Sequence, residues 1–421
     1  MFEKEEKFFP IKKAPACQLK WTWSTIILTE GTTSSCHRCF KVPLTEENFD
    51  NFHNLPHKVN ERELMLDGKW PTKENGGSGH CTYCKTIEDS GGTSDRMHHL
   101  KIPNLAPKEL DNNPLATTVT PKILEIFLNK TCNLKCTYCN TKNSTQWTAE
   151  SKKFGPIYDT QGKEYSHLAY RENVSNYRKL FEKCLEWIEK NGHELRRLHL
   201  AGGEPFYQSE LQEVLDVLKK IKNKHLEFNI ISNFMVKEDK FKSTIERIKQ
   251  LVKDKNIGRF DLTASIDGWG PEAEYARTGL KIDHFNRLFE YACNEKWIFL
   301  NTNQTITALT MRTVPELIKI LNSYRKHRTI NQEIGFVTGR PFMLPDIYGK
   351  EFWQSDIDKI LSIMPEDNEN NRRAKIYMTG CLNSLPKESN PILIKELKHF
   401  LDQLDIRRNT NWRSVFPYLN I

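Results

Sequence analysis

The sequence predicts an α/β protein: a partial (β/α)6 barrel preceded by a small α+β domain. Three observations lead to this prediction. The chain has 421 residues, which is enough for one large and one small domain. From about residue 122, short apolar runs rich in β-forming residues alternate with longer amphipathic patterns, which is typical of a parallel sheet covered by helices. Residues 1–100 lack this alternation and carry five of the eleven cysteines.

Six apolar runs are expected to be the barrel strands. Their bounds are 123–129, 196–202, 226–232, 260–267, 297–306 and 331–339. The patterns between them have helical periodicity: in residues 176–191, Leu180, Cys184 and Ile188 recur on one face of a helix. Because the carboxyl ends of parallel strands gather at one edge of a sheet, we expect the functional loops there.

The chain is expected to have four parts. They are an N-terminal domain (1–100), a linker rich in Pro and Asn (101–121), the partial barrel (122–345) and a C-terminal helical extension (346–421). Within the first part, residues 24–36 are expected to form two strands that turn at Glu30-Gly31.

Charge and hydropathy narrow the range of partners. Lys and Arg exceed Asp and Glu by eight (62 against 54), but the charges are spread along the chain without a basic tail or stripe, so nucleic acid is not favoured as a partner. The first residues lack an apolar signal segment, and no run of about eighteen apolar residues follows. We therefore expect a cytoplasmic protein with no membrane partner. In the reducing cytoplasm, clustered cysteines indicate metal binding more than disulfides.

Cys132, Cys136 and Cys139 stand in the order C-x3-C-x2-C directly after the first predicted barrel strand. Iron–sulfur clusters usually have four cysteine ligands, so three cysteines would leave one iron with an open position for a substrate or cofactor. A structural zinc loop is the alternative, and it would need a fourth ligand. Spacing alone leaves both alternatives open.

The cysteine loop resembles the signature of the radical S-adenosylmethionine (SAM) superfamily, and further motifs follow in the order found in that family. After the second predicted strand comes AGGEPF, with Gly202, Gly203 and Glu204. Two glycines let backbone carbonyls approach a cationic amine closely, and the glutamate supplies a negative partner. The resemblance implies a TIM-like radical SAM barrel, in which the three cysteines hold a [4Fe-4S] cluster and AGGEPF holds the methionyl amine of SAM.

Other polar residues at the predicted strand ends match SAM-binding segments of the family. They are Tyr138, Ser232, Asn233, Ser265, Asp267, Arg277 and Asn303. Residues 265–277 resemble the S-x-D-G…R segment of peptide-modifying radical SAM enzymes, in which the serine and the arginine contact the ribose and the carboxylate of SAM. Arginine suits a carboxylate because its planar fork binds both oxygens. By the same resemblance, Tyr138 borders the adenine and Asn303 is a candidate for the ribose; turn capping is the alternative for Asn233 and Asp267.

The resemblance also implies a radical mechanism. An external electron donor such as flavodoxin or ferredoxin reduces the cluster, an electron passes to the sulfonium of SAM, and the carbon–sulfur bond breaks to give methionine and a 5′-deoxyadenosyl radical. That radical abstracts a hydrogen atom from the substrate. The cofactors carry the chemistry, and the protein orients them and excludes water.

The N-terminal cysteines indicate a second metal site. Cys17 and Cys36 fit the pattern C-x(9–15)-G-x4-C, and Cys81-x2-Cys84 follows. This resembles the SPASM and twitch domains of radical SAM enzymes, although here the segment precedes the barrel and the later SPASM cysteines are missing. The resemblance implies one auxiliary [4Fe-4S] cluster on Cys17, Cys36, Cys81 and Cys84. Cys39 leaves an alternative open, since Cys36-x2-Cys39 with Cys81-x2-Cys84 would also make a zinc ribbon.

Three functions are compatible with these observations. The first is a radical SAM enzyme that modifies a peptide, with a net oxidative change, because an auxiliary cluster with four cysteine ligands has no open iron and would transfer electrons. The second is a radical SAM enzyme that acts on a small metabolite, sugar or nucleoside. The third is a non-catalytic zinc and iron–sulfur binding protein. Among the other thiols, Cys184 and Cys293 are expected in the core and Cys381 in a loop.

Overall fold

The computed structural model describes residues 7–36, 39, 41–170 and 172–419. In these residues the strands form one nine-stranded sheet in the order β3-β2-β1-β4-β5-β6-β7-β8-β9. The strands are β1 Trp23–Ile27, β2 Thr32–Ser34, β3 Val42–Pro43, β4 Ile123–Phe127, β5 Arg197–Ala201, β6 Asn223–Ser232, β7 Ile257–Ser265, β8 Phe299–Ile306 and β9 Asn331–Phe336. Strands β1 and β4 to β9 pair in parallel, and β2 and β3 continue the sheet beyond β1 in antiparallel pairing.

The helices are α1 Gln18–Thr22, α2 Pro56–Leu66, α3 Thr82–Asp89, α4 Asp95–His99, α5 Glu109–Asn112, α6 Thr145–Phe154, α7 Tyr177–Asn191, α8 Glu210–Lys220, α9 Glu238–Lys253, α10 Gly270–Ala276, α11 Ile282–Asn294, α12 Val314–Arg325, α13 Gly349–Ile363, α14 Glu369–Asn383, α15 Pro391–Arg408 and α16 Trp412–Val415. Helices α6 to α12 alternate with the barrel strands, as the sequence predicts. In the described residues, no helix is long and apolar enough to cross a membrane.

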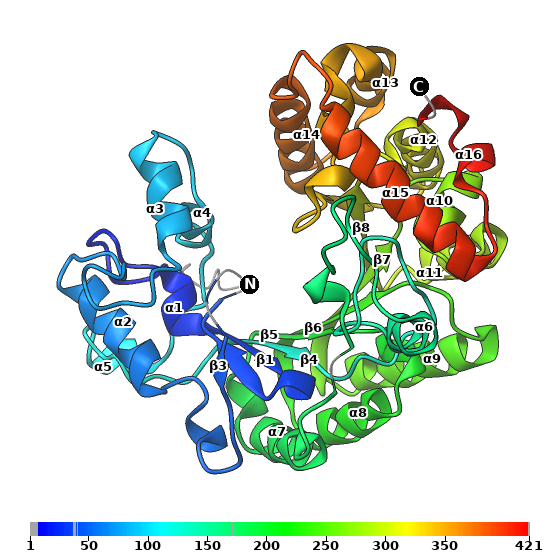
Figure 1. The fold of residues 1–421 in the computed structure, drawn as a ribbon. Coiled ribbons are helices and arrows are strands. Elements are labelled where there is room, and N and C mark those ends of the chain that lie inside the picture. The colour runs from blue at the N-terminus through cyan, green and yellow to red at the C-terminus, as the bar shows by residue number, and fades with distance from the viewer. Residues whose placement is uncertain (1–6, 37–38, 40, 171, 420–421) are drawn as a thin grey trace.

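The predicted barrel strands are confirmed. β4 to β9 coincide closely with the six predicted runs and stand side by side in chain order. Helices α7, α8 and α9 cover one face of the sheet (Figure 1), and the apolar side chains of the strands, such as Leu124, Leu198 and Phe228, pack against them in one large core. In α7, Leu180, Cys184 and Ile188 are buried, as their spacing predicts.

The N-terminal part is joined to the barrel through the sheet. The predicted hairpin is confirmed: β1 and β2 turn at Gly31, whose φ of 57° lies in the left-handed region that favours glycine. Strand β1 also pairs in parallel with β4, with Trp23 opposite Ile123 and Ile27 opposite Phe127. The sequence did not predict this pairing, because the two strands are about a hundred residues apart in the chain.

The segment expected to be a linker is docked on the N-terminal part. The Trp21 indole donates a hydrogen bond to the carbonyl of Ala116 (2.8 Å), and the Asn54 amide donates one to the carbonyl of Val119 (3.0 Å). Residues 101–121 therefore pack on the N-terminal part of the chain.

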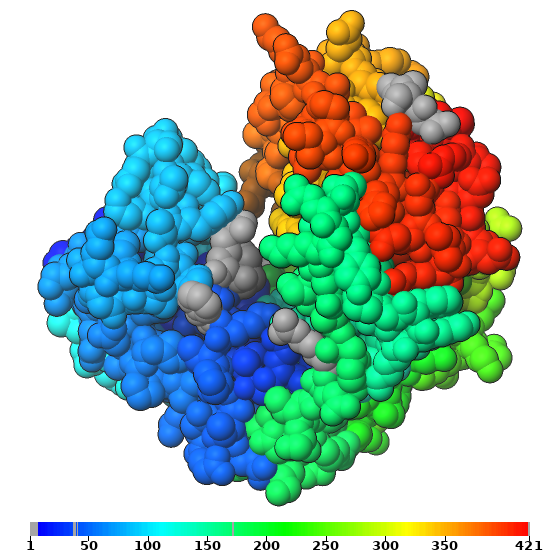
Figure 2. All heavy atoms as spheres, viewed as in Figure 1, coloured from blue at the N-terminus to red at the C-terminus, as the bar shows by residue number. Residues whose placement is uncertain are grey.

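Helices α13 to α16 form a C-terminal group with a core of its own, which includes Trp353, Phe400 and Trp412. Cys293 is buried, as predicted. Cys381 lies within α14, so the prediction of a loop was wrong; the helix begins with an Asn368 side chain that caps it. The surface is hollowed between the N-terminal part and the C-terminal group (Figure 2), on the open side of the sheet.

Candidate active site

The three cysteines of the predicted cluster site lie in one loop, here called the cysteine loop (residues 128–144), between β4 and α6. Cys132 and Cys136 are buried, and Cys139 is half-buried. Their side chains pack with Leu134, Tyr138 and Met235 in a small apolar group of their own. The structure thus brings the three predicted thiols together at the carboxyl end of the first barrel strand.

Hydrogen bonds from helix α6 fix the backbone of the cysteine loop. The Ser144 hydroxyl donates to the carbonyl of Leu134 (2.6 Å) and caps the helix at the same time. The Trp147 indole donates to the carbonyl of Cys136 (2.8 Å), and the Thr145 hydroxyl donates to that of Cys132 (3.0 Å). These hydrogen bonds fix the backbone carbonyls of the loop. They therefore orient the cysteine residues toward one site.

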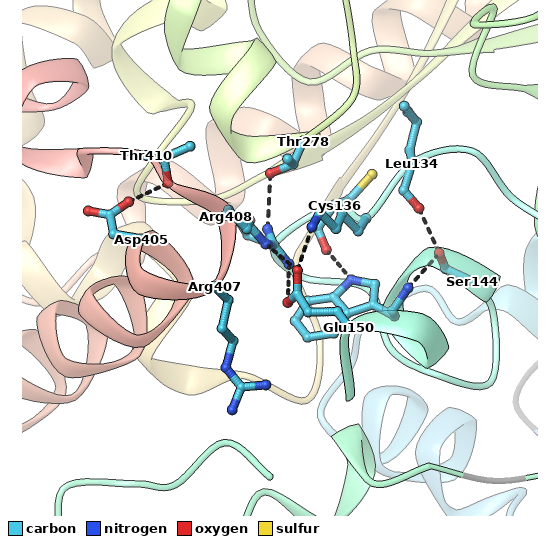
Figure 3. A network of polar contacts seen from close by, with 12 residues as sticks. Leu134, Cys136, Ser144, Glu150, Thr278, Asp405, Arg407, Arg408 and Thr410 are labelled. Carbon is cyan, nitrogen blue, oxygen red and sulfur yellow. Dashed lines mark hydrogen bonds and ion pairs between the residues drawn. The ribbon is translucent and has the colours of Figure 1, made fainter. Parts of the chain in front are cut away.

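A charged network that includes the C-terminal group contacts α6 (Figure 3). The Arg408 guanidinium at the end of α15 donates to both carboxylate oxygens of Glu150 (3.0 and 3.1 Å) and to the hydroxyl of Thr278 (3.0 Å). Lys135 of the cysteine loop binds the same carboxylate at 2.7 Å. Burial alone would raise the pKa of Glu150, but Arg408 and Lys135 lower it, so the carboxylate stays charged.

The surroundings of the sulfur atoms suit thiolate ligands. The backbone N–H of Leu134 and the amide of Asn233 both donate toward Sγ of Cys132, at 3.4 and 3.8 Å. Burial raises the pKa of Cys132 and Cys136, so a metal would have to supply the charge that removes their protons.

The arrangement is compatible with a cluster that is bound by three cysteines. In the described residues, no three or more His, Cys, Asp or Glu side chains are arranged to hold one metal ion. A [4Fe-4S] cluster does not need such convergence, because each cysteine binds a different iron at a corner of the cluster. Three thiols in one loop, with N–H donors aimed at a sulfur, are therefore consistent with the group that the motif implies.

The predicted Gly-Gly-Glu turn packs directly on the cysteine loop. Gly202 and Gly203 have φ values of 86° and 52°. A Cβ atom on Gly203 would lie 2.4 Å from the carbonyl oxygen of Thr131, and the N–H of Glu204 donates to that same oxygen (2.9 Å). Only glycine fits this approach, so the turn and the loop are held at a fixed separation.

Glu204 is fully buried and ties two strand ends together. Its carboxylate accepts hydrogen bonds from the Ser232 hydroxyl (2.9 Å) and from the backbone N–H groups of Phe206 (3.1 Å) and Asn233 (2.6 Å). No cation of the described residues forms an ion pair with it. Burial raises its pKa to about 7 despite these hydrogen bonds, so the group is poised to change charge near neutrality.

The buried pair Asp267 and Arg277 contacts the half-buried Tyr138 of the cysteine loop. One NH group of Arg277 donates to both oxygens of Asp267 (3.1 Å each) and to the Tyr138 hydroxyl (2.6 Å), and that hydroxyl donates to Asp267 (2.5 Å). The Nε–H of Arg277 is buried without an acceptor in the structure. A buried donor left open in this way marks a place for an acceptor such as a carboxylate.

Two further predicted residues face the open side of the sheet. Ser265 and Asn303 are opposite each other on β7 and β8, and both are half-buried. Their position at the carboxyl ends of the strands is the predicted one, and their contact with a ribose stays a prediction.

Sequence reasoning missed a row of polar residues on the open face of the sheet. The row consists of Thr25, Glu125, His199, Asn229 and Asp261, each opposite the next on neighbouring strands. Nε2 of His199 and Oδ1 of Asn229 are buried without hydrogen-bond partners. The sequence did contain a signal for this row. Parallel strands that are buried on both faces are usually continuous apolar runs, whereas in these strands polar and apolar residues alternate.

Glu333 on β9 lies on the same open face. Its side chain is exposed, but desolvation by the protein around it raises its pKa. The open face of the sheet therefore carries three carboxylates, those of Glu125, Asp261 and Glu333.

The N-terminal cysteines line a second site, here called the cysteine pocket. Its lining includes Cys17, Cys36, Cys39, Cys81 and Cys84. Sγ of Cys36 and Sγ of Cys39 are 3.3 Å apart. The ammonium of Lys20 lies 3.0 Å from Sγ of Cys39 and also pairs with Glu61, and both charged groups are buried. The structure thus brings the four predicted ligands and the competing Cys39 into one pocket, and the choice among them stays open.

Comparisons with known proteins agree with the site in the barrel. Residues 126–265 match the family model of the radical SAM superfamily. The chain is also similar to a GTP 3′,8-cyclase of Aquifex aeolicus (strain VF5), with 27% identity over 157 residues, a match that covers 36% of this chain and 37% of that relative. The residues of this chain that match the family model include the cysteine loop and the Gly-Gly-Glu turn. The match to the radical SAM superfamily therefore covers the site in the barrel, whereas the cysteine pocket lies outside the matched residues.

Proposed function

We propose that this protein is a radical SAM enzyme that binds a [4Fe-4S] cluster through Cys132, Cys136 and Cys139 and cleaves SAM reductively. One observation carries the proposal. The three thiols share a loop that is braced by hydrogen bonds, packed on a Gly-Gly turn, and located within the residues that match the superfamily. A non-catalytic metal protein would have no use for three ligands instead of four.

The side chains around the loop have separate tasks in this proposal. When bound, the cluster supplies the electron and an open iron for the methionyl group of SAM. The open Nε–H of Arg277 receives the carboxylate of SAM, and Gly202 and Gly203 let carbonyls approach its amine. The carboxylate of Glu204 binds the backbone of the Gly-Gly-Glu turn and of Asn233, and its negative charge favours the amine of SAM. Oδ1 of Asn233 accepts a hydrogen bond from the N–H of Met235 (2.8 Å) and so caps the turn. Its amide also donates toward Sγ of Cys132, so we assign it a second role beside the cluster.

The remaining predicted contacts complete the pocket. Ser265 and Asn303 face the ribose, and Tyr138 borders the adenine, with its hydroxyl fixed by Asp267 and Arg277. The hollow beside the sheet receives the substrate and limits access of water to the radical (Figure 2). An external donor such as flavodoxin or ferredoxin supplies the electron.

We further propose an auxiliary [4Fe-4S] cluster in the cysteine pocket. The convergence of Cys17, Cys36, Cys81 and Cys84 on one cavity supports it. A zinc ribbon with Cys39 in place of Cys17 is the alternative, and the short distance between the sulfurs of Cys36 and Cys39 favours it. With four cysteine ligands, the pocket would serve electron transfer after hydrogen abstraction, which implies a net oxidative reaction.

Two substrate classes compete. A peptide is the substrate that the S-x-D-G…R resemblance implies, and no comparison supports it independently. The similarity to a GTP 3′,8-cyclase favours a small molecule such as a nucleotide. That similarity covers 36% of this chain and 37% of the relative. Incubation with each class and a search for deuterium transfer from labelled substrate into 5′-deoxyadenosine would decide between them.

The test of the main proposal is anaerobic reconstitution with iron and sulfide, followed by reduction with dithionite in the presence of SAM. The expected products are methionine and 5′-deoxyadenosine. Cys136→Ala should yield none, whereas Cys381→Ala, which removes a thiol from α14, should match the wild type. If Cys136→Ala still formed 5′-deoxyadenosine at the parent rate, the proposed cluster site would be wrong.

A further inference from the structure

Arg340 is a buried cation that touches the backbone of the cysteine loop. It follows β9 and is only 2% exposed. Its two terminal NH groups donate to the carbonyl oxygens of Thr137 and of Cys139, the third cysteine of the loop. The guanidinium therefore lies directly behind a proposed cluster ligand.

No acid accompanies this charge. The guanidinium carbon lies 5.6 Å from the ring centre of Trp147 and 5.2 Å from that of Phe400, and one NH group approaches Sδ of Met343 at 4.0 Å. Among the residues that the structure describes, no carboxylate forms an ion pair with Arg340. Burial lowers its pKa to about 9, so the side chain remains charged at neutral pH.

The other cations around the loop differ from Arg340 in this respect. Arg277 is paired with Asp267, and Lys135 and Arg408 share Glu150. Each of these three cations thus has a carboxylate partner. An unpaired buried charge is costly, so the position of Arg340 calls for an anion that the protein chain itself does not provide.

A cluster held by three thiolates is such an anion, and it becomes more negative when it takes up an electron. We propose that Arg340 is a positioning residue whose charge favours the reduced state of the cluster on Cys132, Cys136 and Cys139, and so raises its reduction potential. The electron comes from the external donor, and nothing else changes in this step. The inference rests on the proposed function, since it requires that cluster.

Trp147 provides a matched comparison. Its indole also donates to a carbonyl of the loop, that of Cys136, but it carries no charge. If Arg340 acted only as a brace, loss of either side chain would have a similar effect on the cluster. If its charge matters, only the loss of Arg340 should shift the potential.

The experiment is an anaerobic redox titration followed by electron paramagnetic resonance, without SAM or substrate, on the reconstituted full chain. To isolate one cluster, all proteins carry Cys81→Ala. In Arg340→Gln, the ratio of reduced to oxidised cluster at a fixed solution potential should fall about tenfold or more, which is 59 mV for one electron. Arg340→Lys keeps the charge, and Trp147→Phe removes the hydrogen bond to Cys136 and part of a buried ring but no charge, so both should stay within about threefold of the parent.

Several results would overturn the inference: an unchanged ratio in Arg340→Gln, or a tenfold shift in Trp147→Phe. If Arg340→Gln failed to retain the cluster, Arg340→Lys would decide, because a tenfold shift there would show that charge is not the cause. Iron content and the visible spectrum of the parent are measured first. A parent without a cluster in the loop would refute the proposed function, whereas a normal cluster with an unshifted potential would refute only the role of Arg340.

Discussion

The cysteine loop and the cysteine pocket present thiols in different ways. In the loop, three cysteines lie within eight consecutive residues, and hydrogen bonds from α6 hold the backbone around them. In the pocket, five cysteines come from three separate segments, and the contacts that the structure shows join side chains, such as Cys36 to Cys39 and Lys20 to Cys39. The loop is organised locally, whereas the pocket depends on the packing of distant segments. The spacing of cysteines in the sequence therefore predicts the ligands of the cysteine loop. It does not predict which cysteines are ligands in the cysteine pocket.

The largest effect expected from this difference is reciprocal loss of metal and activity. Replacing Cys132, Cys136 and Cys139 together by Ala should abolish SAM cleavage completely and leave the metal of the pocket in place. Cys81→Ala should remove the pocket metal and still permit formation of 5′-deoxyadenosine. Iron analysis should therefore fall from about eight to about four irons per chain in either variant, if both sites hold clusters. Loss of all metal in either variant would mean that the two sites do not load independently.

The second prediction distinguishes the two ligand sets of the pocket. If the pocket holds a cluster on Cys17, Cys36, Cys81 and Cys84, Cys17→Ala should lose about four irons and Cys39→Ala should keep them. A zinc ribbon predicts the reverse, with one zinc lost in Cys39→Ala only. Elemental analysis and Mössbauer spectroscopy of the two variants would decide, and the two cysteines serve as controls for each other.

The third prediction concerns the buried ion pair beside the loop. Arg277→Ala leaves Asp267 buried without its cation, and this should lower the free energy of unfolding by about 3–5 kcal/mol. Lys7→Ala, which removes an exposed partner of Asp111, should cause no measurable change. Urea unfolding of the metal-free proteins would measure both. A small effect of Arg277→Ala would mean that water reaches Asp267.

The smallest effect is a pH dependence of SAM binding. Burial raises the pKa of Glu204 to about 7 from an ordinary value of 4.5, so the folded protein holds this proton until near neutrality. The stability that Glu204 contributes is present below pH 4.5 and is lost as the pH rises through 7. An ionised Glu204 attracts the amine of SAM, so affinity should increase up to about tenfold between pH 6 and pH 8.

Glu204→Gln should remove that slope while the cluster content stays the same. Anaerobic equilibrium dialysis at pH 6, 7 and 8 would measure the affinity of both proteins. An equal slope in Glu204→Gln would assign the titration to another group and leave Glu204 with a structural task alone.

The sequence was sufficient for features that are local. Alternating apolar runs predicted β4 to β9, and the spacing of three cysteines after a strand predicted the cysteine loop. It was not sufficient for features that join distant segments: Arg340 meets Cys139 across about 200 residues, and Arg408 meets Glu150 across an even longer separation. Neither contact can be read from the spacing within one motif. Arg340 does follow the last barrel strand, and a charged residue at that edge of a parallel sheet was the available signal.

The pairing of β1 with β4 bears on how this protein could be shortened. The first strand of a partial barrel would ordinarily expose a row of unpaired N–H and C=O groups along one side, and β4 is the apolar segment ILEIF. Here β1 covers that side along its whole length, and β2 and β3 lie beyond it. A fragment that began at residue 122 would expose the unpaired edge and invite self-association through added strands. The N-terminal hairpin thus protects the barrel against aggregation, whatever metal the cysteine pocket binds.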